Sequence, residues 1–322
     1  MRGWLCCGLM LSLGVVSAAE TKKSYLDEKD AGADFAVQGE YAGEITVEGD
    51  ARKVAAQVVA RGDGQFFLAG YQGGLPGDGW NGDERVKLDG KTENGETKFQ
   101  GPNFSISIKD GKLSVTDDEG NLLGTCPKVS RKSPTLGEKP PAGALVLFDG
   151  SNADAWDPAV LTEDMLMGVG TRTKQKFGSF RLHLEFRTPY MPLATGQARG
   201  NSGMYLHDQY ECQILDSFGL DGADNECGGL YSVSKPKVNM CFPPLAWQTY
   251  DVELTAAKFD DQGKVVEPVK ATIKHNGVVI HNNVSLKVTP GGGQNDQKPG
   301  ALFLQNHGDP VRFRNIWLVE TK

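Results

Sequence analysis

The side chains best suited to bind sugars or to move protons gather between residues 201 and 219. This stretch carries more polar groups than a strand needs when only one of its faces is buried, because such a strand alternates apolar and solvated residues. Hydroxyl, amide, imidazole and carboxylate groups all occur within it. Its polar members are Ser202, Tyr205, His207, Glu211, Gln213 and Asp216. The pattern indicates a β-hairpin with a functional face.

The register of this hairpin decides which side chains lie beside Glu211. A two-residue loop, Asp208-Gln209, places Glu211 and Gln213 beside Met204 and Leu206. A three-residue loop, 208–210, places them instead beside Tyr205 and His207. A shift of one residue exchanges the two faces of a strand, so both registers stay open at this stage. In either register Glu211 and Gln213 point the same way.

Glu211 is the strongest candidate for a catalytic group. A carboxylate in an otherwise apolar strand must find partners or shift its pKa. Glu211 and Asp216 are an odd number of residues apart, so a regular strand points them to opposite faces. The hairpin alone therefore does not supply the pair of carboxylates that an ordinary glycosidase uses.

Further polar groups lie on other predicted strands. Each of these strands carries its polar residues on one face, and the candidates are Glu185, Arg187, Gln305, His307 and Arg314. A simpler interpretation exists for some of them. Glu185 and Arg187 can form a surface ion pair, and His307 can cap the turn that Gly308 begins.

The turn and strand pattern predicts an all-β protein. Strands are expected at 180–187, 203–207, 210–215, 250–255, 269–275, 278–281, 301–306 and 312–319. The pairs Asp110-Gly111 and Asn276-Gly277 indicate tight hairpins. Without βαβ alternation, the pattern favours an antiparallel sandwich or jelly roll. We expect a small β-rich domain at 20–132, a Pro/Gly linker at 133–144 and the sandwich at 145–322.

Residues 1–19 have the pattern of a secretory signal peptide, with Arg2 before a short apolar run and small residues at its end. We therefore expect export to a periplasm or beyond. No segment predicts a membrane span. The formal net charge of −7 becomes −8 when the one arginine of the signal peptide is removed. An acidic surface disfavours nucleic acids and anionic membranes as partners, whereas a neutral carbohydrate stays compatible with it.

Four cysteines follow the predicted signal peptide. Cys227 and Cys241 lie on either side of a loop that contains Gly and Pro, and export permits disulfides. We predict a disulfide between these two residues, which would stabilise the fold by about 3 kcal/mol in the chain-entropy model. The alternative is that all four are buried thiols.

The C-terminal part resembles the bacterial 3-keto-disaccharide hydrolase family. The resemblance runs from Leu147-Phe148-Asp149-Gly150 to the C-terminus. Its matching pieces are Glu185-Phe186-Arg187, Gly200-Asn201-Ser202-Gly203, 210–216, Cys227-Gly228-Gly229, 247–251, His275-Asn276-Gly277-Val278, 304–308 and 310–317. The N-terminal domain is similar to an extension that some members carry.

The resemblance implies a concanavalin A-like sandwich with a sugar site on its concave face. It also implies substrates that carry a ketone at sugar C3, which acidifies the C2 proton and permits elimination of the C1 aglycone before water adds. In that scheme Glu211 is the base, with Glu185 second, and His307 is the acid. Arg187 or Arg314 holds the enolate, and Asn201, Gln213 and Gln305 orient hydroxyls. A divalent metal held by Glu211 and His307 is a further option.

Two other functions compete with this prediction, because the fold hosts both enzymes and binding modules. A non-catalytic carbohydrate-binding module would rely on aromatic platforms, and Trp247 and Trp317 occupy strand contexts typical of a core. An ordinary glycoside hydrolase is the other. The set of Glu, His and Arg candidates favours an enzyme.

Overall fold

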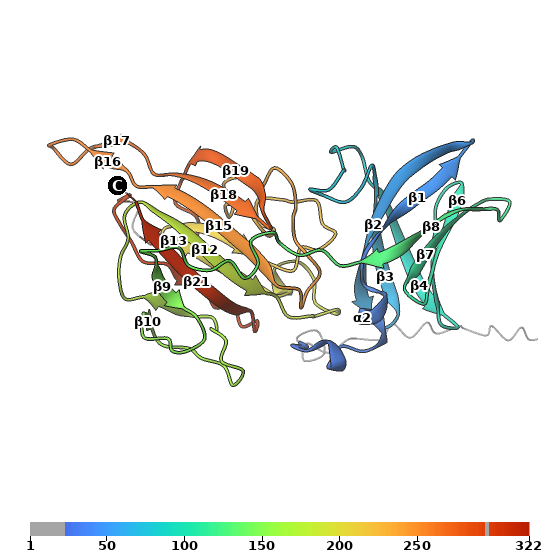
Figure 1. Cartoon of the computed structure of the whole chain (residues 1–322), viewed down its shortest axis with the longest axis horizontal. Helices are drawn as coiled ribbons and strands as arrows, with labels where there is room; N and C mark the ends of the chain where they lie inside the picture. The colour runs from blue at the N-terminus through green and yellow to red at the C-terminus, as the bar shows by residue number, and fades with distance from the viewer. Residues whose placement is uncertain (1–22, 294–295, 322) are drawn as a thin grey trace, which may run out of the picture.

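The computed structural model describes residues 23–293 and 296–321, which form two β units side by side (Figure 1). The predicted signal peptide lies outside the described residues. Helices within the described part are short: η1 Glu28–Asp30, α2 Ala33–Val37 and η2 Gly196–Ala198. None of the helices described is long and apolar enough to span a bilayer.

The N-terminal unit is a closed barrel in which each strand pairs with the next and β8 pairs with β1. Alternate residues face its interior, as the period of a strand requires. Tyr41, Val58, Phe66 and Phe99 are among the buried inward residues. Its strands are β1 Gly39–Val47, β2 Asp50–Gly62, β3 Gln65–Gln72, β4 Val86–Glu93, β5 Glu96–Gln100, β6 Phe104–Lys109, β7 Lys112–Asp117 and β8 Leu122–Val129.

The C-terminal unit is an antiparallel sandwich, so the predicted all-β fold class is confirmed. One sheet has the order β10-β11-β20-β13-β14 and the other β19-β18-β15-β12-β21-β9. A small two-stranded sheet, β16 Lys258–Phe259 with β17 Val265–Glu267, stands apart. The five-stranded sheet contains β10 Trp156–Asp157, β11 Thr171–Thr173, β20 Phe303–Leu304, β13 Ser202–Leu206 and β14 Tyr210–Ile214. The six-stranded sheet contains β19 Val278–Ser285, β18 Lys270–His275, β15 Gln248–Thr255, β12 Phe180–Arg187, β21 Arg312–Glu320 and β9 Leu145–Phe148.

Side-chain alternation gives each sheet one buried face and one outer face. On β12, Leu182, Leu184 and Phe186 enter the core between the sheets, so His183 and Glu185 point outward. Both predicted tight hairpins are confirmed: Asp110-Gly111 joins β6 to β7 and Asn276-Gly277 joins β18 to β19. All four turn residues have positive φ, from 49° to 81°, as a two-residue turn of this kind requires.

The segment between the two units is not a free tether. It crosses the outer face of the six-stranded sheet, where it appears as the green strand-less stretch after β8 (Figure 1). Ser133 Oγ lies 2.6 Å from Thr249 Oγ1 on β15, and Thr135 Oγ1 donates to Asp251 Oδ2 at 2.7 Å. We call residues 133–138 the strap.

Charged side chains join the barrel to the sandwich. The buried Arg199 side chain donates to Asp216 Oδ2 at 2.6 Å and to the carbonyl oxygen of Ala60 on β2 at 3.3 Å. Lys87 of β4 forms an ion pair with Asp221 of the sandwich at 2.9 Å. The buried charges of Arg199 and Asp216 therefore compensate each other.

The predicted Cys227–Cys241 disulfide is wrong for this structure. Cys126, Cys212, Cys227 and Cys241 are all free and buried. The Cys227 thiol lies 3.3 Å from the Tyr250 hydroxyl, and the Cys241 thiol contacts the carbonyl oxygens of Leu215 and Phe242. Thiols with such partners pack as small core residues. The alternative, four buried thiols, describes the structure.

Gly277 tests how firmly the strap is held. A Cβ on Gly277 would collide with the Pro134 ring, and the φ of +81° is strained for other residues. We expect Gly277→Ala to lower the unfolding free energy by about 2–4 kcal/mol, combining left-handed strain with displacement of the strap. Chemical denaturation followed by tryptophan fluorescence measures this.

The matched control is Gly263→Ala, in the same unit, where φ is +76° and no atom lies within 4 Å of the new Cβ. It should cost only the strain, about 1–2 kcal/mol. Equal losses for the two variants would show that Pro134 does not hold the strap against the sheet.

Candidate active site

The hairpin β13–β14 pairs Tyr205 with Glu211 and Leu206 with Tyr210. Its loop is therefore His207-Asp208-Gln209, three residues long, and His207 and Asp208 adopt φ of 54° and 57°. The sequence left two registers possible, and the structure has the one that places Glu211 on the same face as Tyr205. The loop begins one residue earlier than expected. Met204 and Cys212 on the opposite face enter the core.

Cross-strand pairing lines up five side chains across the outer face of the five-stranded sheet. Each member is opposite the next on the neighbouring strand. The row runs Asp157, Arg172, Phe303, Tyr205 and Glu211. Neighbouring members interact: the Arg172 guanidinium lies 3.7 Å from the centre of the Phe303 ring, and that ring lies 5.4 Å from the Tyr205 ring. The row brings a cation, two aromatic rings and two carboxylates onto one surface.

Gly203 makes room for the Glu211 carboxylate beside this row. It is paired with Gln213 on β14, and its backbone carbonyl accepts from Gln305 N. A Cβ on Gly203 would collide with Glu211 Oε1 and would lie 3.0 Å from Gln305 Oε1. Two acceptor oxygens thus converge over a residue without a side chain, and only glycine accommodates them at this position.

Glu211 is ionisable near neutral pH. The side chain is buried, with 2% of the residue exposed, and Tyr205 Oη donates to Oε2 at 2.8 Å. Burial raises the pKa of Glu211 to about 7, although the hydrogen bond from Tyr205 lowers it. No charged neighbour among the described residues contributes to this shift. A carboxylate with such a pKa can both take and return a proton at neutral pH.

Amide groups around Glu211 retain free hydrogen-bonding capacity. Gln305 Nε2 donates to Tyr205 Oη at 3.2 Å, and Gln213 Nε2 donates to Gln197 Oε1 at 3.0 Å. Within the described part of the chain, Gln305 Oε1 and Asn201 Oδ1 are buried without a hydrogen-bond partner. Buried acceptors of this kind are normally satisfied, so a hydroxyl-rich ligand fits them.

A cleft of about 600 Å³ adjoins the Asp157–Arg172 end of the row. Arg172 bonds Asp208 at 3.1 Å at its edge. Charged groups of both signs line it, including Asp157, Arg172, Lys174, Lys176, Asp208 and Asp296. The cleft extends the polar surface of the row in the direction of β10.

Glu185, Arg187 and Arg314 do not join Glu211. They lie on the outer face of the other sheet, across the sandwich core. The Glu185 carboxylate accepts from Arg314 Nε at 2.7 Å, from Asn315 Nδ2 at 2.9 Å and from the strap amide Gly137 N at 2.6 Å. Because these donors saturate it, Glu185 holds the strap. The ion pair expected with Arg187 is formed with Arg314 instead.

The two tryptophans expected in the core also lie on this outer face. The guanidinium groups of Arg187 and Arg314 lie over the Trp247 ring, with their Cζ atoms 5.1 Å and 4.0 Å from the ring centre. Trp317 is buried by the strap and stacks on His183, with ring centres 5.2 Å apart. The expectation that they belong to the core was wrong, because the strap covers a face that the strand pattern alone cannot identify as covered.

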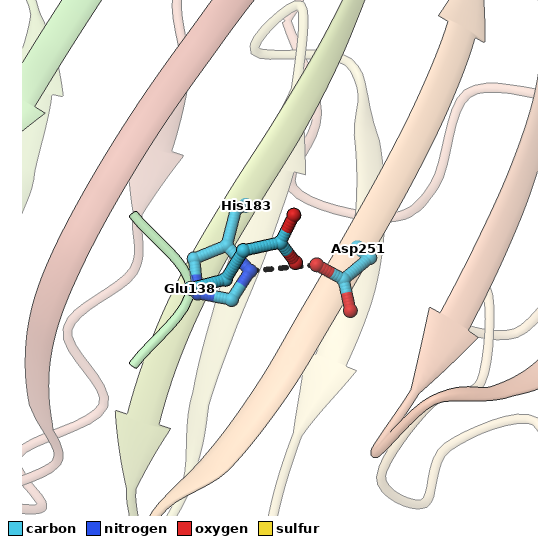
Figure 2. Close-up of side chains that lie close together, drawn as sticks. All are labelled: Glu138, His183 and Asp251. Atoms are coloured by element: carbon cyan, nitrogen blue, oxygen red, sulfur yellow. Dashed lines mark hydrogen bonds and ion pairs between the residues drawn. The ribbon is translucent and has the colours of Figure 1, made fainter. Parts of the chain in front are cut away.

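One group of three metal-type donors occurs among the described residues, Glu138, His183 and Asp251 (Figure 2). His183 Nδ1 lies 2.6 Å from Asp251 Oδ1, and Nε2 lies 3.5 Å from Glu185 Oε1. Burial lowers the pKa of His183, but Asp251 and Glu185 outweigh it and raise the pKa to about 9. In the structure the imidazole contacts the carboxylates of Asp251 and Glu185, and we call these three residues the ion-pair cluster under the strap.

His307 lies in the exposed turn that follows Gln305 and Asn306. A metal held by Glu211 and His307 was one option. The one group of three metal-type donors among the described residues contains neither of them. The sequence reasoning also left Arg172, Gln197 and Thr289 out of the site. Thr289 Oγ1 accepts from Glu211 N at 2.9 Å. Only the strand order, which places β11 and β20 beside β13, could reveal Arg172.

The chain is similar to one protein family and to several solved structures. Residues 143–319 match the 3-keto-alpha-glucoside-1,2-lyase-like domain. A crystal structure from Parabacteroides distasonis, provisionally assigned as a glycosyl hydrolase, is 32% identical, covers 56% of this chain and 85% of its own, and has a TM-score of 0.49. A second protein from that organism, with the same provisional assignment, is 18% identical, covers 56% of this chain and 94% of its own, and has a TM-score of 0.39. No functionally curated protein matches the chain.

Fold and site together define a β-sandwich protein of the carbohydrate-active, glycosyl hydrolase-like class. The chain belongs to the family of 3-keto-alpha-glucoside-1,2-lyase-like domains, whose profile covers more than half of it.

The ion-pair cluster predicts how stability depends on pH. The folded-state pKa of His183 is raised to about 9, so its contribution is complete below about 6.5 and is lost as pH rises through 9. The pKa of Glu185 is lowered to about 2 by its hydrogen bonds, so its contribution is present above about 4.5 and is lost as pH falls through 2. We expect unfolding free energy to fall by on the order of 3 kcal/mol between pH 6.5 and 9.5.

Denaturation at several pH values measures this slope. Asp251→Asn should reduce the fall in unfolding free energy between pH 6.5 and 9.5, which we call the alkaline limb, because it removes the partner that raises the pKa of His183. Glu253→Gln, an exposed outward residue on the same strand, serves as the control and should leave the limb intact. A limb that persists in Asp251→Asn would assign it to other groups.

Proposed function

We propose that the protein is an exported enzyme that cleaves 3-keto-glycosides by elimination, with Glu211 as the base. One observation carries the proposal: Glu211 is a buried carboxylate without a cationic partner, its pKa is about 7, and its Oε1 lies over Gly203 beside the unpartnered Gln305 Oε1. The family description supports the same chemistry, because a 1,2-lyase breaks the C1–O bond with loss of the C2 proton.

The proposed reaction begins at C2 of the keto sugar. Glu211 takes the C2 proton, and the electron pair enters an enolate conjugated with the C3 ketone. The C1–O bond then breaks as the C1=C2 double bond forms, and the departing oxygen takes a proton from His307 or from water. Water adds at C1, its second proton replacing the one given to the leaving group. The proton on Glu211 returns to C2, so Glu211 ends ionised and the net reaction is hydrolysis.

The neighbours of Glu211 have separate tasks in this scheme. Tyr205 stays protonated because burial and the Glu211 charge raise its pKa. It therefore orients the carboxylate by donating to Oε2. The nearest donors for the developing charge on the C3 oxygen are the amide groups of Gln213 and Gln305. Asn201 Oδ1 and Gln305 Oε1 accept from sugar hydroxyls, and the cleft at Arg172 takes the aglycone.

Two observations favour this reaction over the alternatives. An ordinary glycosidase needs a second carboxyl group across the bond. The nearest buried acid on the hairpin, Asp216, is instead bound to Arg199. A simple binding module gains nothing from a buried, unpaired carboxylate, which costs free energy to ionise. Export is supported by the composition of residues 1–19.

Replacing Glu211 should separate catalysis from stability. Glu211→Gln should lower kcat for a 3-keto-glucoside by at least ~10²-fold, and at pH 8 it should leave the fold as stable or more stable. An acid with a raised folded-state pKa loses stability as pH rises from about 4.5 through 7, and the amide removes that cost. Activity of the parent should rise with pH through about 7.

Glu185→Gln is the matched control, since Glu185 is also a buried carboxylate but holds the strap. It should lower stability without a comparable loss of kcat. Full activity in Glu211→Gln would remove Glu211 from the role of base.

Substrate selectivity is tested by aglycone release from a 3-keto-glucoside and from its unoxidised parent, each with and without EDTA. Release from the keto substrate alone supports elimination, and its loss with EDTA adds a divalent metal. Release from the parent sugar would identify an ordinary hydrolase, and release from neither would favour a binding module.

The absence of a side chain at Gly203 gives an independent prediction. Gly203→Ala places a methyl group against Glu211 Oε1 and Gln305 Oε1. We expect a loss in kcat/KM of at least ~10²-fold, because misplacement of a reacting group by about 1 Å has an effect of this size. Unchanged kinetics in a folded Gly203→Ala protein would place the sugar elsewhere.

A further inference from the structure

The interior of the N-terminal barrel is filled at one end only. At the end near α2, large side chains close it, among them Tyr41, Phe66 and Phe99 from the strands. Phe35 of α2 packs there against Tyr190 of the sandwich, with ring centres 5.0 Å apart. Figure 1 shows α2 at this end and the tip of the β1–β2 hairpin at the other.

The end at the β1–β2 hairpin keeps free space inside the barrel. Gly70 on β3 pairs with the inward Ala56, so it faces the interior and has no side chain to fill it. Gly70, Ala56 and Ile45 line a cavity of about 540 Å³. An eight-stranded barrel has an interior wide enough to be filled by side chains or to hold one small ligand, and here the second arrangement applies to one half.

The wall of this cavity is apolar. Its inward lining includes Ile45, Val54, Leu68, Phe104, Leu113 and Val115. Several of these side chains are only half-buried, and Val86, which pairs with Gly70, is 39% exposed. Apolar side chains that face the inside of a barrel yet stay accessible mark a surface that a ligand can cover.

A cationic residue, Arg52, lies at the mouth of the cavity. Arg52 continues the inward series of Val54 and Ala56 on β2 and is exposed. It forms no ion pair within the described ranges. The rim also includes Lys53, Glu84 and Asn103. Along β2, Arg52 and Ala56 are separated by about 13 Å of extended chain, which gives the depth of the apolar part.

We propose that the barrel binds one amphiphile with an unbranched alkyl chain and a carboxylate head. The chain occupies the cavity below Val54, and the head pairs with Arg52. Sugars do not fit, because the lining side chains offer few hydrogen-bond partners. This site is separate from Glu211, so it stands whether or not the sandwich cleaves keto sugars.

Titration of residues 20–322 with dodecanoate, dodecanol and dodecylammonium tests the proposal. We expect dodecanoate to bind one per chain and more tightly than the other two. Arg52→Gln should weaken dodecanoate at least fivefold and leave dodecanol unchanged. Lys112→Gln, an exposed lysine at the α2 end of the barrel, should change neither. Equal weakening by both variants would overturn the role of Arg52.

Filling the cavity provides a second test. Val86→Trp alters a half-exposed inward residue and should abolish binding while circular dichroism and cleavage activity stay unchanged. Retained binding in this variant would overturn the cavity as the site. Monomeric dodecanoate and anionic phospholipid vesicles form separate arms. Association with vesicles, without binding of monomeric dodecanoate, would overturn the proposed small ligand in favour of a membrane surface.

Discussion

The burial of the Glu211 carboxylate without a cation is the constraint on which the site depends. Burial alone raises the pKa of a carboxyl group, and the single hydrogen bond from Tyr205 does not cancel that effect. The three-residue loop sets this environment, because it pairs Tyr205 with Glu211 and Gly203 with Gln213. A shift of one residue would bury Glu211 in the core and expose Met204. The register of the hairpin therefore sets the pKa of Glu211.

The two sheets use similar polar residues for different purposes. On the six-stranded sheet, Glu185 accepts three hydrogen bonds and its pKa falls to about 2. On the five-stranded sheet, Glu211 accepts one and its pKa rises to about 7. The difference arises mainly from His183, Asn315 and Arg314, and the strap amide of Gly137 adds a smaller part. Residue type does not distinguish a structural from a reactive carboxylate; the number of donors around it does.

The barrel also contacts the sandwich close to the strand that carries Glu211. Asp216 follows β14 by two residues and binds Arg199, which in turn donates to Ala60 of β2. The end of the strand that carries Glu211 is thus tied to the barrel through a buried ion pair. Groups that position a catalytic residue act best on rigid elements. In this respect the barrel stiffens the sandwich, whatever it binds in its own cavity.

The sequence by itself determined the all-β class, the tight hairpins at Asp110 and Asn276, and the shared strand face of Glu211 and Gln213, because alternation and turn chemistry are local properties. It did not determine the neighbours of those residues. Arg172 reaches the row through strand order, and Glu185, Arg187 and Arg314 lie across the core, where the strap covers Glu185 and its neighbours. Cys227 and Cys241 are free thiols buried in the core. These features depend on contacts between distant segments, which only the tertiary structure decides.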